Sequence, residues 1–405
     1  MLFKSVLLSI AFWLVFLTGV RSTVIPPEDC GKQDYESLQR AAVLAARWMK
    51  TNHMDDGRYV YLYDYAADRT PDDYNEVRHA GVTMSLYQAA GRLQDADALE
   101  TADSALQWMI DNSIERHGWT ALAPYSTAKL GGSALMLISL AERRLATSDP
   151  QYDDLMHGLA TFIAEMQRDD GGFYIHWNVS TDEPNTVDTS RYYPGESLWA
   201  LALMHEAFPD EGWDGHAWSA LEFITERRDD VENVDFPPLP DQWAAYGIAE
   251  MIEWGLTDQQ ADYARRLAGR FGLLVRSEAQ RQGSWYGNAA RGNTFGRASG
   301  VGTWTEALSS LWRASQYDPR LADLSEPIAE RLHCVAGILA ERQYEPDEAA
   351  DYPRPELVEG AWFRANETRM DDQQHAFSGI LYTLDMLDDN PVREPQLPGF
   401  PRPLQ

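Results

Sequence analysis

Two kinds of helical segment alternate six times along this sequence. The first kind is amphipathic, with apolar residues at helical spacing and charges on the opposite face, as in half-exposed helices. The second kind is apolar on most sides and rich in Gly and Ala, as in buried helices that approach one another closely. The amphipathic segments span residues 35–49, 95–110, 152–167, 216–228, 258–271 and 324–342, and the apolar ones span 80–90, 130–140, 195–205, 243–254, 303–313 and 376–387.

Such strict alternation is typical of a repeat architecture in which each unit is an outer helix followed by an inner helix. An open array of repeats needs polar capping repeats at its ends, and the sequence shows none. The fold class predicted is therefore all-α, an (α/α)6 toroid of six helical hairpins, in one domain over residues 23–390. The alternatives are an open array of helices or two smaller bundles. Residues 391–405 are Pro-rich and predict an extended tail.

The N-terminus predicts a signal peptide over residues 1–22. Lys4 precedes a short apolar run from Val6 to Val20, and Val20-Arg21-Ser22 offers a cleavage site. The run is shorter than the roughly 20 apolar residues that cross a bilayer, so we expect a periplasmic or secreted protein with no membrane span after processing. The alternative is an uncleaved N-terminal anchor.

The net charge of −29 argues against a nucleic acid partner, because phosphates would be repelled. The two cysteines, Cys30 and Cys334, can form a disulfide in an oxidising compartment. They lie near opposite ends of the chain, which a closed ring would bring together. The alternative is a pair of inert thiols. We expect a monomer.

The connections that lead into the inner helices are long, about 15 to 30 residues, and loops of that length in a compact domain are usually functional. The connections from inner to outer helices are short, as at residues 91–94. The functional end of the ring is therefore predicted to be the one with the long loops, where all six inner helices begin.

Carboxylates, aromatic rings and scarce cations gather at these six helix starts. A charged residue at one helix start is often only a cap, and a buried aromatic is often only core. Six polar starts converging on one funnel indicate a site. The candidate catalytic residues are Glu196, Asp371, Asp372, Glu306, Asp241, His375 and Tyr193, and the candidate substrate-binding residues are Glu76, Arg78, His79, Lys129, Arg191, Tyr192, Trp243, Trp304 and Arg369.

Two chemistries fit these residue types. A glycosidase needs two carboxylates across the scissile bond, and we favour Glu196 with Asp371 or Asp372. An epimerase or lyase needs a base such as His or Tyr near a cation that holds an acid group. Aromatic rings and cations favour an anionic or polyhydroxylated ligand, such as a uronate-containing glycan, unless the cations only pair with the carboxylates. There is no GxSxG, HExxH or CxxC motif, so we expect no metal and no cofactor.

The chain resembles the broad (α/α)6-toroid group, which includes six-hairpin glycosidases, N-acylglucosamine epimerases, glucuronyl epimerase C-terminal domains and polysaccharide lyases. Residues 167–173, Gln-Arg-Asp-Asp-Gly-Gly-Phe, are similar to the Q-x-x-D-G-G-F turns of helical toroids, terpene cyclases among them. The D-x-D-D motif of those cyclases is missing. The resemblance implies a carbohydrate-active enzyme, a hydrolase, epimerase or lyase. The alternative is a toroid that binds a glycan or a protein of the cell envelope without catalysis.

Overall fold

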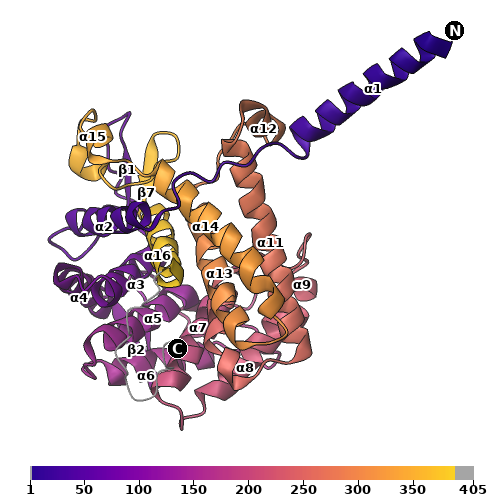
Figure 1. The fold of residues 1–405 in the computed structure, drawn as a ribbon. Coiled ribbons are helices and arrows are strands. Elements are labelled where there is room, and N and C mark those ends of the chain that lie inside the picture. The colour runs from indigo at the N-terminus through magenta and orange to yellow at the C-terminus, as the bar shows by residue number, and fades with distance from the viewer. Residues whose placement is uncertain (1, 388–405) are drawn as a thin grey trace.

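The computed structural model describes residues 2–387 and shows two concentric layers of helices (Figure 1). The expected tail, residues 391–405, and the expected domain boundary at residue 390 lie outside the described residues. The outer helices are α2 (Tyr35–Thr51), α4 (Ala96–Asp111), α6 (Asp153–Glu165), α8 (Trp213–Glu222), α11 (Asp258–Gln282) and α14 (Ser325–Arg342). The inner helices are α3 (Glu76–Arg92), α5 (Leu130–Thr147), α7 (Tyr193–Ala207), α10 (Gln242–Glu250), α13 (Ala298–Tyr317) and α16 (Met370–Leu387). The predicted (α/α)6 toroid is confirmed.

Burial explains the two layers. The inner helices are buried on nearly all sides, as α5 and α7 show, while the outer helices bury one face and expose the other. One hydrophobic core fills the space between the layers. Side-chain caps define several helix starts: Asp34 accepts from the backbone N–H of Ser37 at α2, and Thr257 forms a capping box with Gln260 at α11.

The ring closes between its first and last repeats. Inner helix α16 packs against α3 as well as α13, and the hydroxyls of Ser85 and Ser378 hydrogen-bond at 2.8 Å across that seam. The strand β1 (Leu62–Asp64), in the first long loop, pairs antiparallel with β7 (Glu367–Arg369), in the last one. The open-array and two-bundle alternatives are therefore wrong.

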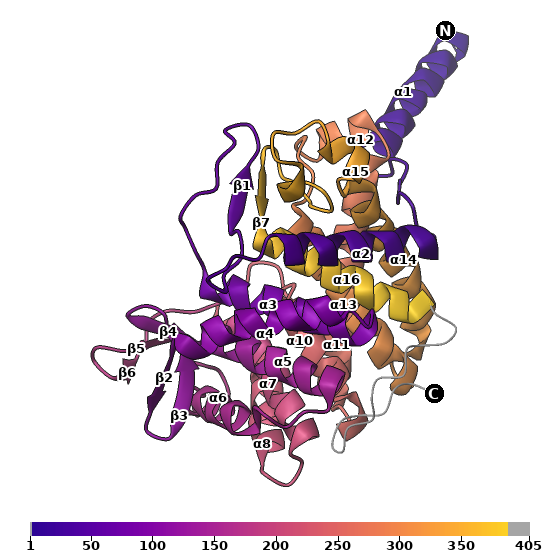
Figure 2. The same ribbon diagram turned by 90° about the vertical axis from the view of Figure 1, so that its left-hand side faces the viewer.

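The long loops contain short strands, although the sequence predicted none. The remaining strands are β2 (Ser113–Arg116), β3 (Trp119–Leu122), β4 (Thr127–Lys129), β5 (His176–Asn178) and β6 (Glu183–Pro184). They form the pairs β1–β7 and β2–β3 and the three-stranded sheet β4–β5–β6, outside the helical layers (Figure 2). Because β4 ends at Lys129 and β7 at Arg369, each leads directly into an inner helix and fixes where it begins. With two to four residues each, these strands are too short to leave a clear alternation in the sequence.

Several helix boundaries differ from the prediction. The fifth inner helix begins at Ala298, five residues earlier than expected, and α11 continues to Gln282, where Val275 and Ala279 extend its buried face. The loop before α10, residues 232–241, is shorter than expected because η1 (Phe223–Arg227) and α9 (Arg228–Val231) follow α8 without a break. The short elements are η1 (Phe223–Arg227), α9 (Arg228–Val231), η2 (Ile252–Trp254), α12 (Trp285–Ala290), η3 (Ala322–Leu324), α15 (Pro346–Ala349) and η4 (Pro355–Leu357).

The N-terminal helix α1 (Leu2–Thr23) projects away from the ring (Figure 1). Its segment Phe3–Thr23 is 21 residues long with a mean hydropathy of 1.9. This helix is long and apolar enough to cross a membrane. The length of the apolar segment therefore does not distinguish a signal peptide from a membrane anchor.

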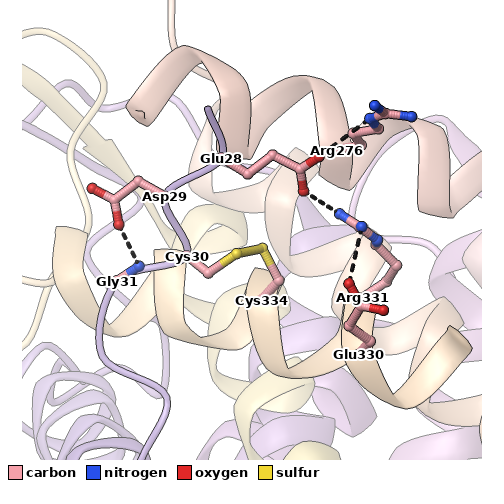
Figure 3. Close-up of a disulfide and its surroundings, with 8 residues drawn as sticks. All are labelled: Glu28, Asp29, Cys30, Gly31, Arg276, Glu330, Arg331 and Cys334. Carbon is pink, nitrogen blue, oxygen red and sulfur yellow. Dashed lines mark hydrogen bonds and ion pairs between the residues drawn. A yellow bond between two sulfur atoms is a disulfide. The ribbon is translucent and has the colours of Figure 1, made fainter. Parts of the chain in front are cut away.

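A disulfide ties the chain after α1 to the ring. Cys30 and Cys334 are bonded, with 4.5 Å between their Cα atoms, and Cys334 belongs to the outer helix α14 (Figure 3). The neighbouring residue Glu28 forms ion pairs with Arg276 of α11 and Arg331 of α14. The N-terminal segment is thereby attached across two outer helices.

We expect loss of this disulfide to lower the free energy of unfolding by about 2 to 5 kcal/mol, because the bond restricts an unfolded loop that spans nearly the whole chain. The measurement is denaturant unfolding of the wild type and of the double variant Cys30→Ala with Cys334→Ala. A reductant should destabilise the wild type and leave the double variant unchanged. Equal sensitivity of both proteins would show that the bond contributes nothing.

Candidate functional site

The first turns of neighbouring inner helices contact one another through glycines. A Cβ atom added at Gly131 of α5 would lie 2.2 Å from Oε2 of Glu196 and 2.4 Å from the ring of Tyr193, both on α7. A Cβ atom at Gly195 would lie 2.7 Å from the carboxylate of Asp241, which caps α10. These glycines let polar side chains of the next helix enter the space that a larger residue would fill. The helix starts therefore converge as predicted.

Five carboxylates at these helix starts each lie against a cation. Asp371 lies between two arginines and Asp372 binds an arginine that precedes α13, so these two neighbours on α16 have separate partners. The pairs are Glu76–Lys129 (3.0 Å), Asp371–Arg78 (3.3 Å) and Asp371–Arg369 (2.8 Å), Asp372–Arg297 (2.8 Å), Asp241–Arg228 (2.5 Å) and Glu306–His375 (2.9 Å). We call this set of residues, together with Glu196 and Tyr193, the rim cluster.

Glu196 is the exception in the rim cluster. Its side chain is buried, its Oε2 has no hydrogen-bond partner, and it has no salt-bridge partner within residues 2–387. Burial, and then the nearby carboxylate of Asp241, raise the pKa of Glu196 well above its usual value. A buried carboxyl without a cation is more stable in its neutral form, so the environment of Glu196 favours its protonated state.

A second acid–base pair joins α13 and α16. Nδ1 of His375 lies 2.9 Å from Oε2 of Glu306, and the amide of Gln374 donates to Oε1 of the same carboxylate at 3.3 Å. Burial alone would lower the pKa of His375, but the Glu306 carboxylate outweighs burial and raises it. The ring of His375 lies 5.6 Å from that of Trp243, centre to centre. This histidine therefore has both a carboxylate partner and an aromatic neighbour.

Asp241 has a structural role. Its Oδ1 accepts hydrogen bonds from the backbone N–H groups of Trp243 and Ala244, and its Oδ2 binds Arg228, with both side chains of that ion pair fully buried. A buried, fully partnered pair of this kind holds the helix start in place. We therefore no longer favour Asp241 as an acid–base residue, although its charge acts on Glu196.

His79 lies away from the rim cluster, contrary to the prediction. Its ring is buried between α3 and α4, where Nδ1 contacts the hydroxyl of Tyr74 at 2.6 Å and Nε2 contacts the backbone oxygen of Ala105 at 3.0 Å. The ring of Trp108 lies 4.4 Å from it, centre to centre. Burial lowers the pKa of His79 to about 3, so this histidine is a neutral core residue.

The remaining predicted residues differ in exposure. Arg191 and Tyr192 are exposed in the loop before α7, and Tyr193 is half-buried, with burial raising its pKa. Trp243 is buried and its ring lies in a stack with Trp199. Trp304 is half-buried two residues before Glu306. Most of the predicted cations, Arg78, Lys129, Arg369 and His375, pair with carboxylates, which is the alternative that the sequence left open.

Known structures share this fold. The unsaturated glucuronyl hydrolase specific for heparin matches with a TM-score of 0.63 and 9% identity, covering 89% of this chain and 100% of its own. A sugar epimerase from a ruminal bacterium matches with a TM-score of 0.61 and 11% identity, covering 88% and 100%. The GH76A α-1,6-mannanase from Salegentibacter sp. HEL1_6 matches with a TM-score of 0.59 and 12% identity, also covering 88% and 100%.

At such low identities the likeness shows the fold alone. No family model matches the chain, and no curated protein matches it either. Function is therefore inferred from the residues of the rim cluster.

Sequence reasoning missed two residues of the rim cluster. Arg297 precedes α13, whose start was placed five residues too late, so the arginine was assigned to a loop. Arg228 lies at the end of an outer helix, and only the fold brings it to Asp241. Gln374 was visible in the Asp-Asp-Gln-Gln-His motif but received no role.

Within residues 2–387, no group of three or more His, Cys, Asp or Glu side chains is placed to hold a metal ion.

Replacing Gly131 with alanine tests the close contact of α5 with α7. The added methyl group would clash with Glu196 and Tyr193, and we expect a loss of about 1 to 3 kcal/mol in the free energy of unfolding. The adjacent Gly132→Ala is the matched control, because its nearest neighbour would be at 3.6 Å, and helix propensity should stabilise it by about 0.5 to 1 kcal/mol. Thermal unfolding of the two variants measures the difference. Equal effects would contradict the packing described.

Proposed function

We propose that this protein is an exported carbohydrate-active enzyme, and that Glu196 is the acid that protonates the departing sugar oxygen. The observation that carries the proposal is the pattern of partners in the rim cluster. Five carboxylates have cations, while Glu196 is buried without one and its pKa is raised by that burial. A neutral carboxylic acid at neutral pH is what a glycosidase requires as its proton donor.

Asp371 is the proposed partner of Glu196 as base or nucleophile. It pairs with Arg78 and Arg369 through Oδ2, while its Oδ1 has no hydrogen-bond partner among the described residues. One oxygen is thus oriented by two arginines, and the other is buried with no hydrogen-bond partner within residues 2–387, so it is the oxygen free to act as base or nucleophile. Asp372 is less suited because Arg297 and the backbone N–H of Ser299 occupy it.

The proposed substrate is an acidic or uronate-containing glycan. Two arginines face the single carboxylate of Asp371, so one positive charge remains at that position to attract an acid group. Arg191 and Tyr192 lie exposed at the same end of the ring and add a cation and an aromatic surface. The known glucuronyl hydrolase and mannanase of the same fold support a glycan substrate in general.

Epimerisation or elimination is the second candidate, and the contact between His375 and Glu306 favours it. A buried histidine with a carboxylate partner can remove a proton next to a carbonyl or carboxyl group. Tyr193, beside Glu196, can act on the opposite face of a sugar.

Export is proposed from the apolar helix α1 and the disulfide.

The test is activity on matched panels of neutral and uronate-containing oligosaccharides, followed by mass spectrometry. We expect Glu196→Gln to lower kcat by about 100-fold or more, the usual effect of losing a general acid. Glu206→Gln is the matched control, because Glu206 lies on the same helix at the other end of the ring and burial also raises its pKa, to about 7.

Equal turnover by wild type and Glu196→Gln would reject the role of Glu196. A product of unchanged mass would favour epimerisation, and retention of an oligosaccharide with no product would favour the binding toroid. Faster turnover of neutral than of uronate-containing sugars would reject the acidic substrate alone.

The pH dependence of stability gives a second prediction. Because the pKa of Glu196 is raised in the folded state, the unfolded state loses this proton first, and its contribution to stability falls as pH rises above the unfolded value of about 4.3. Glu196→Gln removes this effect. We expect the variant to gain stability relative to the wild type as pH increases from 4 to 8, measured by urea unfolding. A constant difference would show that Glu196 is not held neutral.

A further inference from the structure

The helix α1 is attached to one end of the ring. Its segment Phe3–Thr23 has the length and hydropathy of a membrane span, and none of it is buried. The helix also contacts α12, a short helix that follows the extended outer helix α11 (Figure 1). The end of the ring that carries α12 is therefore the part of the domain nearest to α1.

The connection between α1 and the ring is short. The backbone N–H of Asp29 donates to the backbone oxygen of Ala279 at 3.0 Å, Glu28 pairs with two arginines, and Cys30 is bonded to Cys334. Only residues 24–27 lie between Thr23 and these attachments. Four extended residues span at most about 14 Å. If α1 stays in a membrane, the end of α11 must remain close to the bilayer surface.

Exposed apolar side chains occupy this end of the ring. Trp285 of α12 is 82% exposed and Phe295 is 45% exposed, while Val24 and Ile25 are exposed in the connection itself. We call these four residues the α12 patch. A single exposed aromatic residue is common, but here the exposed apolar residues cluster where the chain leaves the domain.

Basic residues accompany the α12 patch in an otherwise acidic protein. Arg342 stacks on Phe295, with its guanidinium 4.6 Å from the ring centre. Arg276 pairs with Glu28, and Arg281 and Arg342 both pair with Glu278. Arg291 forms no salt bridge within residues 2–387, and burial, followed by repulsion from Arg281 and Arg276, lowers its pKa. Aromatic rings with nearby arginines are typical of segments at a membrane surface, where the rings enter the headgroup region and the cations meet anionic lipids.

We propose that α1 is retained as a membrane anchor and that the α12 patch rests on the surface of the bilayer. The disulfide between Cys30 and Cys334 favours the orientation with the domain outside the cytoplasm, where this bond can form. Arg297, which binds Asp372, comes two residues after Phe295, so the membrane-facing segment leads directly to the rim cluster. This proposal does not depend on the proposed chemistry.

The first experiment asks whether α1 is retained. The full chain is expressed in a bacterium, membranes are washed with high salt and alkaline carbonate, and the intact mass is determined. Retention of the full sequence, including Lys4, in the washed membranes supports the proposal. A soluble protein that begins at Thr23 would overturn it.

The second experiment asks what covers the α12 patch. Hydrogen–deuterium exchange of the full chain is compared in detergent micelles and in vesicles of an equal mixture of phosphatidylethanolamine and phosphatidylglycerol. We expect residues 283–297 to exchange at least about threefold more slowly in the vesicles. Trp285→Ser combined with Phe295→Ser should remove this protection, whereas Phe236→Ser, at a residue that is 71% exposed elsewhere, should not.

Equal exchange in micelles and vesicles would overturn the contact with the bilayer. Protection of residues 283–297 by soluble oligosaccharides alone would assign Trp285 to sugar binding instead and would also overturn it. The activity of Glu196→Gln is independent of both outcomes, so failure of this proposal and failure of the proposed function can be told apart.

Discussion

Ion pairs between neighbouring helices hold the starts of the inner helices together. Each pair joins residues from different elements: Glu76 with Lys129, Asp371 with Arg78, Asp372 with Arg297, Asp241 with Arg228, and Glu306 with His375. Buried charges are tolerated only when they are partnered, so a ring with this much charge near its core depends on nearly complete pairing. The same constraint makes the unpaired Glu196 informative, because burial without a cation raises the pKa of its carboxyl and favours the neutral form.

The packing of the inner helices makes these pairs possible. Glycines at the first turns bring α5 against α7 and α7 against the start of α10, so that Glu196 and Asp241 fill the space of absent side chains. The β1–β7 pairing and the contact of α16 with α3 close the ring, which places α16 beside both its sequence neighbour and the first repeat. Asp371 can therefore bind Arg78 of the first repeat, and Asp372 can bind Arg297, which precedes the fifth inner helix.

The fold could be predicted from the sequence, because the alternation of amphipathic and apolar helices appears directly in residue order. The ion-pair partners within the rim cluster could not be predicted from the sequence. Arg297 and Asp372 are separated by 75 residues and Glu306 and His375 by 69, and nothing local indicates that they meet. His79 was wrongly predicted to contact substrate. Its position at a helix start was predicted correctly, but the rotation of α3 turns its side chain toward α4. A helix start predicts which end of the ring a residue occupies, and only packing decides which way it points.

The protonation state of Glu196 tests the account most directly. Infrared difference spectra between the wild type and Glu196→Gln at neutral pH report the carboxyl group that the substitution removes. We expect the wild type to show the C=O stretching band of a protonated, buried carboxylic acid, which shifts in deuterium oxide and is absent from the variant. Loss of a carboxylate band instead would show that Glu196 is ionised, and would contradict both its role as proton donor and the pairing pattern from which that role was inferred.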